Sequence, residues 1–146
     1  GCPCGNDDTV SGCRNSTGRG AFSWGCGTTS VTTDDLVLGV EGLPKNQPGL
    51  VYMGGGQLNA PFGDGLRCVG AGGVGVFRFA PPFFSSSAGT FSLGPGIVAR
   101  SHRFSPGGEI DAGETWYFQA WYRDPMNSPC GNFFNLSNAL SIAFVP

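Results

Sequence analysis

The sequence predicts an all-β fold: an antiparallel β-sandwich of the jelly-roll or immunoglobulin-like type, with about eight strands. Short apolar runs alternate with a period of two, which is typical of strands that bury one face. Gly and Pro, 26 and 11 residues, separate these runs at turn-like intervals. No segment shows a convincing period of 3.6. The chain of 146 residues has the length of one domain. We therefore expect a single domain over residues 1–146, with a disulfide-tied segment at 1–26 and the sandwich at 27–146.

The apolar runs place the expected strands at residues 21–26, 31–41, 50–53, 66–69, 74–79, 90–93, 97–104, 114–123 and 139–145. Turns are expected at 44–49, 61–65 and 105–108, where Pro and Gly occur together. The run 114–123 has aromatic residues on both faces, which predicts a central strand covered on both sides. In the last strand Leu140, Ile142 and Phe144 alternate inward.

The charge content excludes some partners. Charged residues make up 12% of the chain, and a single Lys, Lys45, stands beside seven Arg, for a formal net charge of -2. No Lys/Arg run is present to neutralise phosphates, which argues against nucleic acid. No apolar stretch of about 18 residues occurs, so no membrane span is expected.

The six cysteines indicate the compartment. Their number is even and no Cys-x-x-Cys pair occurs, a pattern that predicts disulfides formed in an oxidising environment. We therefore expect a secreted protein, extracellular or on the cell surface, and a mature form from which a leader has been removed. A metal site or a redox dithiol would want Cys-x-x-Cys spacing, and the chain has one His. Of 15 pairings, we expect Cys4–Cys13, Cys2–Cys26 and Cys68–Cys130.

Five segments in order along the chain carry a resemblance: Cys2-Pro3-Cys4-Gly5-Asn6, Gly12-Cys13-Arg14-Asn15-Ser16, Pro61-Phe62-Gly63-Asp64-Gly65-Leu66-Arg67-Cys68, Trp121-Tyr122-Arg123-Asp124-Pro125 and Phe134-Asn135-Leu136-Ser137-Asn138-Ala139-Leu140. Together they resemble a secreted, disulfide-bonded β-domain that recurs in exported proteins of planctomycete-type environmental bacteria. The resemblance implies export, disulfides and a β-rich module, and it supplies no catalytic residues. Cys26 has no counterpart in the pattern of that family.

The residues do not predict an enzyme. A Ser/His/Asp triad would need His102, which lies between Arg100 and Arg103, and no Gly-x-Ser-x-Gly motif occurs. We expect His102 to be an exposed strand residue. The carboxylates Glu109, Asp111, Glu114 and Asp124 give no specific glycosidase pair, and Asp124 is expected to cap a turn.

No cofactor is expected, and Ca²⁺ is a minor alternative. Oxygen-rich clusters at residues 6–8, 34–35 and 64 do not follow a calcium-loop pattern. The sequons at Asn15 and Asn135 match the N-glycosylation pattern, but turns and strand ends explain both asparagines equally well.

Two functions remain. The favoured one is an extracellular structural protein, a self-assembling subunit of a cell-surface filament, sheath or layer, with itself as partner. Its expected contacts are aromatic pairs in loops and the last strand: Phe83, Phe84, Phe133, Phe134, Leu140, Ile142 and Phe144. The alternative is a carbohydrate-binding or adhesion module for extracellular polysaccharide that stacks sugars on Trp116, Trp121 and Tyr122, although core packing of a central strand is the simpler interpretation of these residues.

Overall fold

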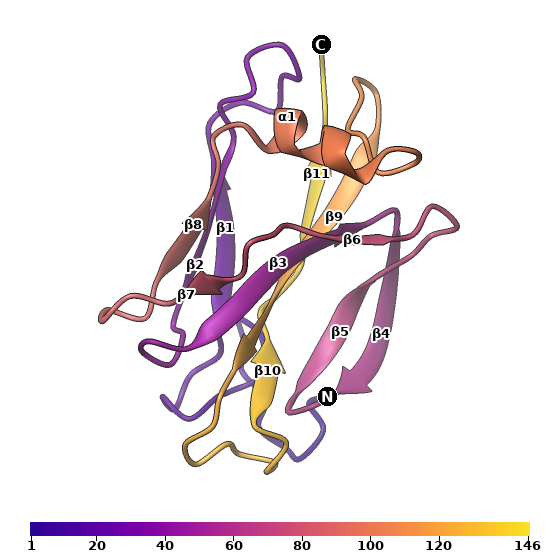
Figure 1. The fold of residues 1–146 in the computed structure, drawn as a ribbon. Coiled ribbons are helices and arrows are strands. Elements are labelled where there is room, and N and C mark those ends of the chain that lie inside the picture. Colours follow the sequence, from indigo (N-terminus) through magenta and orange to yellow (C-terminus); the bar gives the residue numbers. More distant parts are fainter.

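Two antiparallel sheets face each other around the main core in the computed structural model, which describes residues 1–146 (Figure 1). The smaller sheet has the order β1-β2-β8 and consists of β1 (Phe22–Cys26), β2 (Val37–Glu41) and β8 (Phe91–Leu93). The core between the sheets is a cluster of 18 buried residues, among them Leu38 of β2 and Phe118 of the opposite sheet. The predicted all-β sandwich is confirmed.

The larger sheet is built on the long pair β3 (Pro48–Gly54) and β9 (Thr115–Arg123). Both β10 (Phe134–Leu136) and β11 (Leu140–Ala143) pair with β9. On the other side, both β6 (Val76–Arg78) and β7 (Phe83–Phe84) pair with β3. Each edge of this sheet is therefore divided into two strands of two to four residues.

Strand β9 is the central strand that its aromatic residues predict. Its even-numbered side chains, Trp116, Phe118, Ala120 and Tyr122, are buried in the main core. Its odd-numbered residues face the other way, because successive side chains of a strand alternate. That outer face carries a second, smaller cluster formed by Tyr52, Val69 and Leu136.

A hairpin of β4 (Gly56–Phe62) and β5 (Gly65–Gly70) covers part of this outer face. The chain turns sharply into the hairpin at Gly54, where a Cβ atom would lie 2.1 Å from the carbonyl oxygen of Gly70. Strand β5 matches the strand predicted at 66–69. Strands β4 and β10 were not predicted. In β4 Leu58, Ala60 and Phe62 do alternate with polar residues, but Pro61 and the glycines on either side indicate a loop, and β10 is only three residues long.

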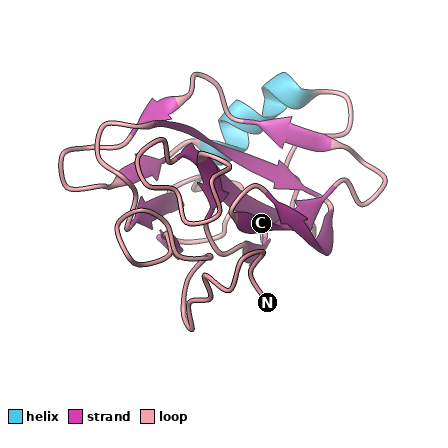
Figure 2. Ribbon diagram, turned by 90° about the horizontal axis from the view of Figure 1, so that it is seen from below, coloured by secondary structure: helices cyan, strands magenta, loops and turns pink.

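The strand expected at 97–104 is wrong. This segment forms the short helix α1 (Ile97–Ser101) and the 3₁₀ turn η1 (His102–Phe104), the only helical ribbons in Figure 2. The carboxylate of Asp34 accepts hydrogen bonds from the backbone N–H groups of Val98 and Ala99, at 2.8 and 2.9 Å. Free N–H groups at a helix start need such acceptors, and here the acceptor comes from a distant part of the chain.

All three expected disulfide pairings are wrong. The bonds are Cys2–Cys13 and Cys4–Cys130, and Cys26 and Cys68 are free. The first bond closes a loop within the N-terminal segment, whereas the second ties that segment to the loop after β9, 126 residues away. Closing a loop of that length constrains the unfolded chain by about 4–5 kcal/mol in the loop-entropy treatment.

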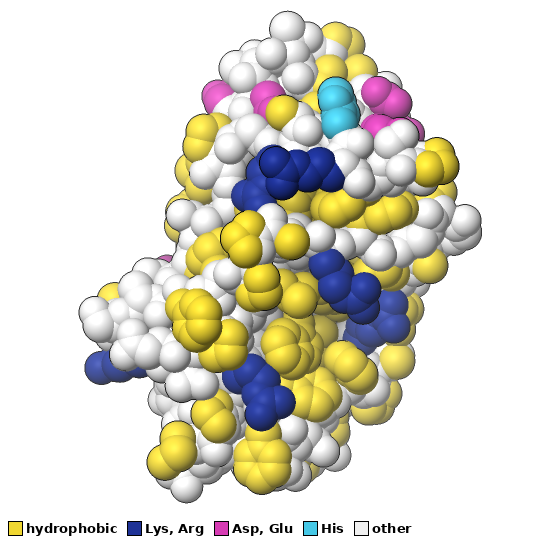
Figure 3. Space-filling model, in the orientation of Figure 1, with side chains coloured by type: hydrophobic (Ala, Val, Ile, Leu, Met, Phe, Trp, Pro, Cys, Tyr) yellow, Lys and Arg dark blue, Asp and Glu magenta, His cyan; other side chains and the backbone are white.

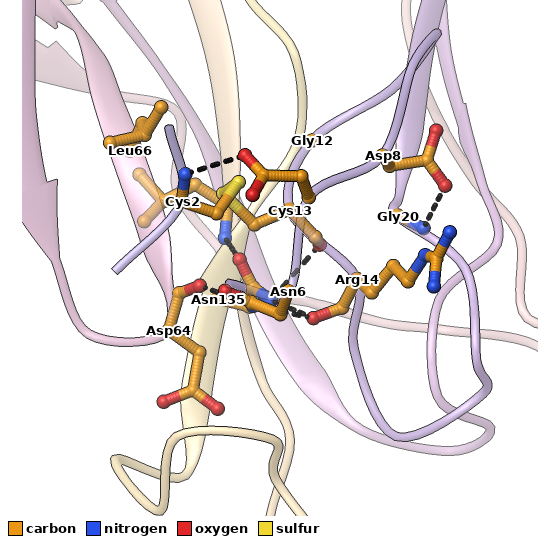
Figure 4. The surroundings of a disulfide bond; sticks show 12 residues. Cys2, Asn6, Asp8, Gly12, Cys13, Arg14, Gly20, Asp64, Leu66 and Asn135 are labelled. Atoms are coloured by element: carbon orange, nitrogen blue, oxygen red, sulfur yellow. Dashed lines mark hydrogen bonds between the residues drawn. A yellow bond between two sulfur atoms is a disulfide. The ribbon is translucent and has the colours of Figure 1, made fainter. Parts of the chain in front are cut away.

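Asn6 explains the geometry of the second bond. Its side-chain Nδ2 donates to the carbonyl oxygens of Arg14 and Asp64, at 2.9 and 2.8 Å (Figure 4). The Asp64 carboxylate in turn accepts the backbone N–H of Cys130. Cys4, two residues before Asn6, is therefore brought to Cys130, while Cys68 lies on the hairpin and its backbone N–H is bound to Gln119.

The exposed edge of β1 is closed by a side chain and by the chain end. Asn138 accepts the N–H of Ser23 with its Oδ1 and donates its Nδ2 to the carbonyl of Ser23, as a neighbouring strand would. Residues Ser30 and Val145 form a parallel bridge farther along. No helix in this structure has the length and apolar character to cross a membrane.

We predict two free thiols per chain in the unreduced, denatured protein, at Cys26 and Cys68. In the native protein Cys26 should react first, because it is exposed, whereas Cys68 is half-buried and burial raises the pKa of its thiol. Thiol titration followed by peptide mapping measures both. The Cys26→Ser variant should retain one thiol, and a count of zero in the unmodified chain would contradict the assignment.

Candidate ligand-binding groove

A buried amide, Gln119, ties β5 of the hairpin to the outer face of the large sheet. Its Oε1 accepts the hydroxyl of Tyr52 at 2.6 Å and the backbone N–H of Cys68 at 2.9 Å. Its Nε2 donates to the carbonyl oxygens of Leu66 and Ser137, at 2.9 and 2.7 Å. Both lone pairs and both protons of the amide are used. The hairpin therefore has a fixed position and forms one wall of a groove on this face.

The strand register arranges the floor of this groove in rows. Arg78 of β6, Tyr52 of β3 and Gln119 of β9 lie opposite one another in the first row. Leu50, Trp121 and Leu136 form the second row, and Arg123 and Phe134 the third. The hairpin adds Phe62 and Arg67, and the groove has a volume of about 430 Å³.

Three aromatic rings form a continuous series along the groove. Phe62 and Phe134 meet edge-on with centroids 5.0 Å apart, and Phe134 lies 5.8 Å from Trp121 at an interplanar angle of 38°. Trp121 and Phe134 are half-buried, and Phe62 is 46% exposed. The rings are thus held by their neighbours while part of each remains open to solvent.

The groove is positively charged. Arg67, Arg78 and Arg123 line it, and no Asp or Glu does. Arg67 is half-buried and its Nε donates to the carbonyl oxygen of Val69 at 3.0 Å, whereas Arg78 and Arg123 are exposed. Burial raises the pKa of Tyr52 well above its usual value, so the phenol stays neutral and does not offset the arginines.

Of the three residues expected to stack on sugars, only Trp121 lies in this groove. Trp116 and Tyr122 point to the opposite face of β9 and are buried in the main core. That part of the expectation is wrong, because β9 is apolar on both faces and alternation alone does not say which face is covered.

The residues expected to make assembly contacts are divided between core and surface. Phe83 and Phe144 are buried in the main core, which contradicts their assignment as surface contacts. Leu140 and Ile142 are half-buried and pack against the same core, so the predicted inward alternation of the last strand is confirmed. Phe134 belongs to the groove. Phe84 and Phe133 are 71% and 51% exposed.

The candidate chemical groups are not brought together. His102 is exposed, as expected, but it lies in the turn η1 and not in a strand. No group of three or more His, Cys, Asp or Glu side chains is arranged to hold a metal ion. Glu114 accepts the indole N–H of Trp116, and Glu109 accepts the backbone N–H of Gly107.

The oxygen clusters considered for Ca²⁺ are engaged by protein donors. Backbone N–H groups of Val10, Ser11 and Gly20 bind the carboxylate of Asp8 and lower its pKa to about 2. Thr28 donates both its hydroxyl and its N–H to Asp35, which lowers the pKa of that carboxyl. A second hollow of about 470 Å³, between the hairpin and the N-terminal segment, includes Asp7 and Asp8. Asp7 accepts the N–H of Cys2.

Asp64 organises the loop that carries Cys130. Its carboxylate accepts hydrogen bonds from the hydroxyl of Ser128, the N–H of Cys130, and the N–H and side-chain amide of Asn132. Burial alone would raise the pKa of Asp64, but these donors outweigh it and lower the pKa.

Asp124 has the opposite environment. Its Oδ2 accepts the N–H of Ser16 at 2.9 Å, while its buried Oδ1 has no hydrogen-bond partner. Burial, reinforced by the negative charge of Asp64, raises the pKa of Asp124.

Both sequon asparagines are buried. Asn15 donates its amide to the carbonyl oxygen of Gly42 and the hydroxyl of Tyr122. Asn135 donates to the carbonyl oxygens of Cys13 and Arg14. Their Nδ2 atoms serve the fold and are not presented at the surface.

No protein-family model, no curated protein and no solved structure matches this chain. The resemblance to secreted planctomycete-type domains therefore stays a prediction.

Sequence reasoning missed Gln119 and all three groove arginines. No sequence pattern identifies Gln119 as a buried hydrogen-bonding residue, because its aromatic neighbours occur on both faces of the strand. The location of two arginines could have been predicted. Arg78 is two residues after Val76 and Arg123 is two residues after Trp121, so each arginine lies on the same face of its strand as that apolar residue.

We predict opposite pH dependences for Asp64→Asn and Asp124→Asn. Asp64→Asn should cost roughly 2–4 kcal/mol of unfolding free energy near neutral pH, because an amide nitrogen replaces an acceptor of charged hydrogen bonds. The difference in unfolding free energy between variant and unmodified protein should shrink as pH falls. A carboxyl whose pKa is lower in the native than in the unfolded protein stabilises the fold when ionised, and this stabilisation is lost when the carboxyl is protonated.

Asp124→Asn should lower the unfolding free energy little near neutral pH and more in acid. A carboxyl whose pKa is raised in the native protein stabilises the fold when protonated, and this stabilisation is lost as pH rises through the native pKa. Urea unfolding of both variants and the unmodified protein between about pH 3 and pH 8 tests the pair. If the loss of unfolding free energy depends on pH in the same way in both variants, the opposite pKa shifts of Asp64 and Asp124 are refuted.

Proposed function

We propose that this chain is a secreted, non-catalytic carbohydrate-binding or adhesion module, and that its ligand lies in the groove beside the β4–β5 hairpin. The observation that carries the proposal is the series Phe62, Phe134 and Trp121, rigidly packed yet partly open to solvent. Two disulfides and the absence of a membrane-spanning helix are compatible with an extracellular location.

Sugar rings suit such a surface because their C–H faces stack on aromatic rings while their hydroxyls stay hydrated at the groove margin. The groove volume lies within the range of about 300–1,000 Å³ found for small-molecule sites. Its lining offers arginine guanidinium groups and a neutral phenol but no carboxylate, histidine, thiol or aliphatic hydroxyl. This composition favours binding over catalysis, which needs a nucleophile or an acid–base pair.

The arrangement of strands favours this role over the strand-exchanging assembly that the sequence favoured. Both edges of the large sheet are split into short strands, and the edge of β1 is closed by Asn138. Short and covered edges are the features that prevent sheets from pairing with further chains. Two of the seven expected contact residues are, in addition, buried in the main core.

We predict that Trp121→Ala weakens polysaccharide binding at least about tenfold, because it removes the largest exposed ring of the groove. Affinity electrophoresis against a panel of plant, algal and bacterial polysaccharides measures this loss. Trp24→Ala is the control, since Trp24 is 37% exposed and lies on β1 of the other sheet, outside the groove.

Trp121→Phe guards against misfolding, because it keeps a ring against Leu50 and Leu136 while reducing the stacking face. Its unfolding midpoint should stay near that of the unmodified protein while its affinity falls. No retention on any polysaccharide, or equal losses in the Trp24 and Trp121 variants, would rule out the groove as a sugar site.

A second candidate is self-association through a sheet face. Phe22, Trp24 and Cys26 alternate along β1, are all exposed, and point away from the buried Ser23. Trp24 lies flat over Gly39 of β2, where an added Cβ would come within 2.2 Å of the indole. An aromatic stripe that ends in a free thiol would suit a second copy of the chain.

On this candidate, sedimentation velocity should show a mass that rises with protein concentration and a return to monomer in Trp24→Ser. Cys26→Ser separates the two possible causes: it removes a disulfide-linked dimer but leaves a non-covalent one. A monomer at all concentrations, with and without reductant, would eliminate this role.

A further inference from the structure

We infer that the groove binds an acidic polysaccharide, whose sugar rings rest on Trp121 and Phe134 and whose carboxylate or sulfate groups pair with Arg78 and Arg123. The inference rests on the proposed carbohydrate-binding function and adds the class of ligand. It is drawn from the placement of the arginines relative to the aromatic rings.

The register puts cations at both ends of the aromatic floor. Arg78 shares its row with Tyr52 and Gln119, and Arg123 shares its row with Phe134. From Gln119 to Arg123 the chain of β9 advances four residues, which at about 3.3 Å per residue is about 13 Å along the strands. A polymer lying along the groove would therefore cross the Trp121 row between two guanidinium groups, with Arg67 at the hairpin wall.

The positive charge of the groove is not balanced within it. No carboxylate lines the groove, and Tyr52 remains protonated. The whole chain has a formal net charge of -2, so the three arginines run against its overall charge. Figure 3 shows the same separation: dark-blue side chains border the apolar surface of the lower part of this face, while most acidic side chains lie toward its upper end.

Arginine is suited to recognise carboxylate and sulfate. Its planar guanidinium donates two parallel hydrogen bonds to such groups, and it is less strongly hydrated than an ammonium. The chain has one Lys and seven Arg, and three of those seven line one groove. Arg78 and Arg123 are exposed and free to adjust to a ligand, which fits a polymer bound at the surface better than an enclosed small anion.

An acidic polysaccharide fits this spacing better than a nucleic acid. A nucleic acid carries a phosphate on every nucleotide. Proteins bind it with a continuous row of basic residues along its backbone and with aromatic rings on which successive bases stack. Here the cations are few and separated, and the three rings meet at 62° and 38°, so they offer no parallel stack. A polysaccharide is held by the apolar faces of its sugar rings and needs only a few of its acidic groups to be paired, which isolated cations between apolar surfaces can provide.

Matched pairs of polymers test the inference directly. Polygalacturonate is compared with its methyl ester, and dextran sulfate with dextran, so that each pair shares a backbone and differs in charge. We expect the anionic member to bind at least about tenfold more tightly than its neutral partner and the difference to shrink as salt is raised. The two pairs distinguish carboxylate from sulfate as the preferred group.

Arg78→Gln and Arg123→Gln should each weaken binding of the anionic polymer by about tenfold, the effect expected for a charge-assisted hydrogen bond. Neither should change binding of the neutral polymer. Arg103→Gln is the control, because Arg103 is exposed in η1, lies outside the groove, and changes the net charge by the same amount. All three positions are exposed, so the variants should fold.

The outcomes separate the inference from the proposed function. If Trp121→Ala abolishes binding while charged and neutral polymers bind alike, the groove is a sugar site and the acidic ligand is refuted. If no polymer binds, both the acidic ligand and the proposed carbohydrate-binding function are refuted. Equal losses in Arg103→Gln and the groove variants would refute the site by showing diffuse attraction. Tighter binding of an oligothymidylate than of either glycan, with the same arginine dependence, would replace the polysaccharide with a nucleic acid.

Discussion

The four hydrogen bonds of Gln119 are the constraint on which the arrangement of the outer face depends. The side chain is buried among aromatic residues, and one amide joins β9 to Tyr52, to the hairpin and to the segment after β10. Any shift of the hairpin would leave part of this amide unpaired, at a cost of about 1–3 kcal/mol for each group. At the hairpin turn the N–H of Asp64 also donates to the carbonyl oxygen of Phe134, at 3.0 Å. The amide selects one register, and with it the wall of the groove and the position of Arg67.

The N-terminal segment is fixed by the same kind of chemistry. Asn6, Asn15 and Asn135 each donate both amide protons to main-chain or tyrosine oxygens, and each makes at least one bond between the N-terminal segment and the rest of the chain. A disulfide restricts the unfolded chain but leaves orientation open, whereas a buried amide with two fixed acceptors specifies direction. Cys4–Cys130 therefore holds the segment near the loop after β9, and the asparagines decide how it lies there. Before β1, residues 1–21 contribute only Cys13 and Ala21 to the buried apolar side chains, so hydrogen bonds and disulfides hold this part of the segment in place.

Much of the fold could be predicted where one residue type dominates a face. β2 and β9 were located because Leu38, Val40 and the aromatic residues keep strict alternation. The helix after Gly96 was missed because its cap, Asp34, is 64 residues from Val98. The disulfide partners were missed because the asparagine and aspartate contacts that align them are equally long-range. At the site, the alternation of side chains along β9 puts Trp121 on the face opposite to Trp116 and Tyr122. Only the tertiary structure shows which of these two faces the smaller sheet covers.

The remaining open part of the outer face has a physical explanation that points to its use. Half-exposed Trp121 and Phe134 leave apolar surface in contact with water, which folding alone would tend to cover. The hairpin could have covered it, yet at this point its wall carries Arg67, while Arg78 and Arg123 border the floor. Mutual repulsion of the three cations that line the groove opposes closing it. The split edges of the sheet hinder pairing with a further strand at its sides. The ligand that we propose lies across this face, rests its ring surfaces on Trp121 and Phe134, and carries negative charge toward the arginines.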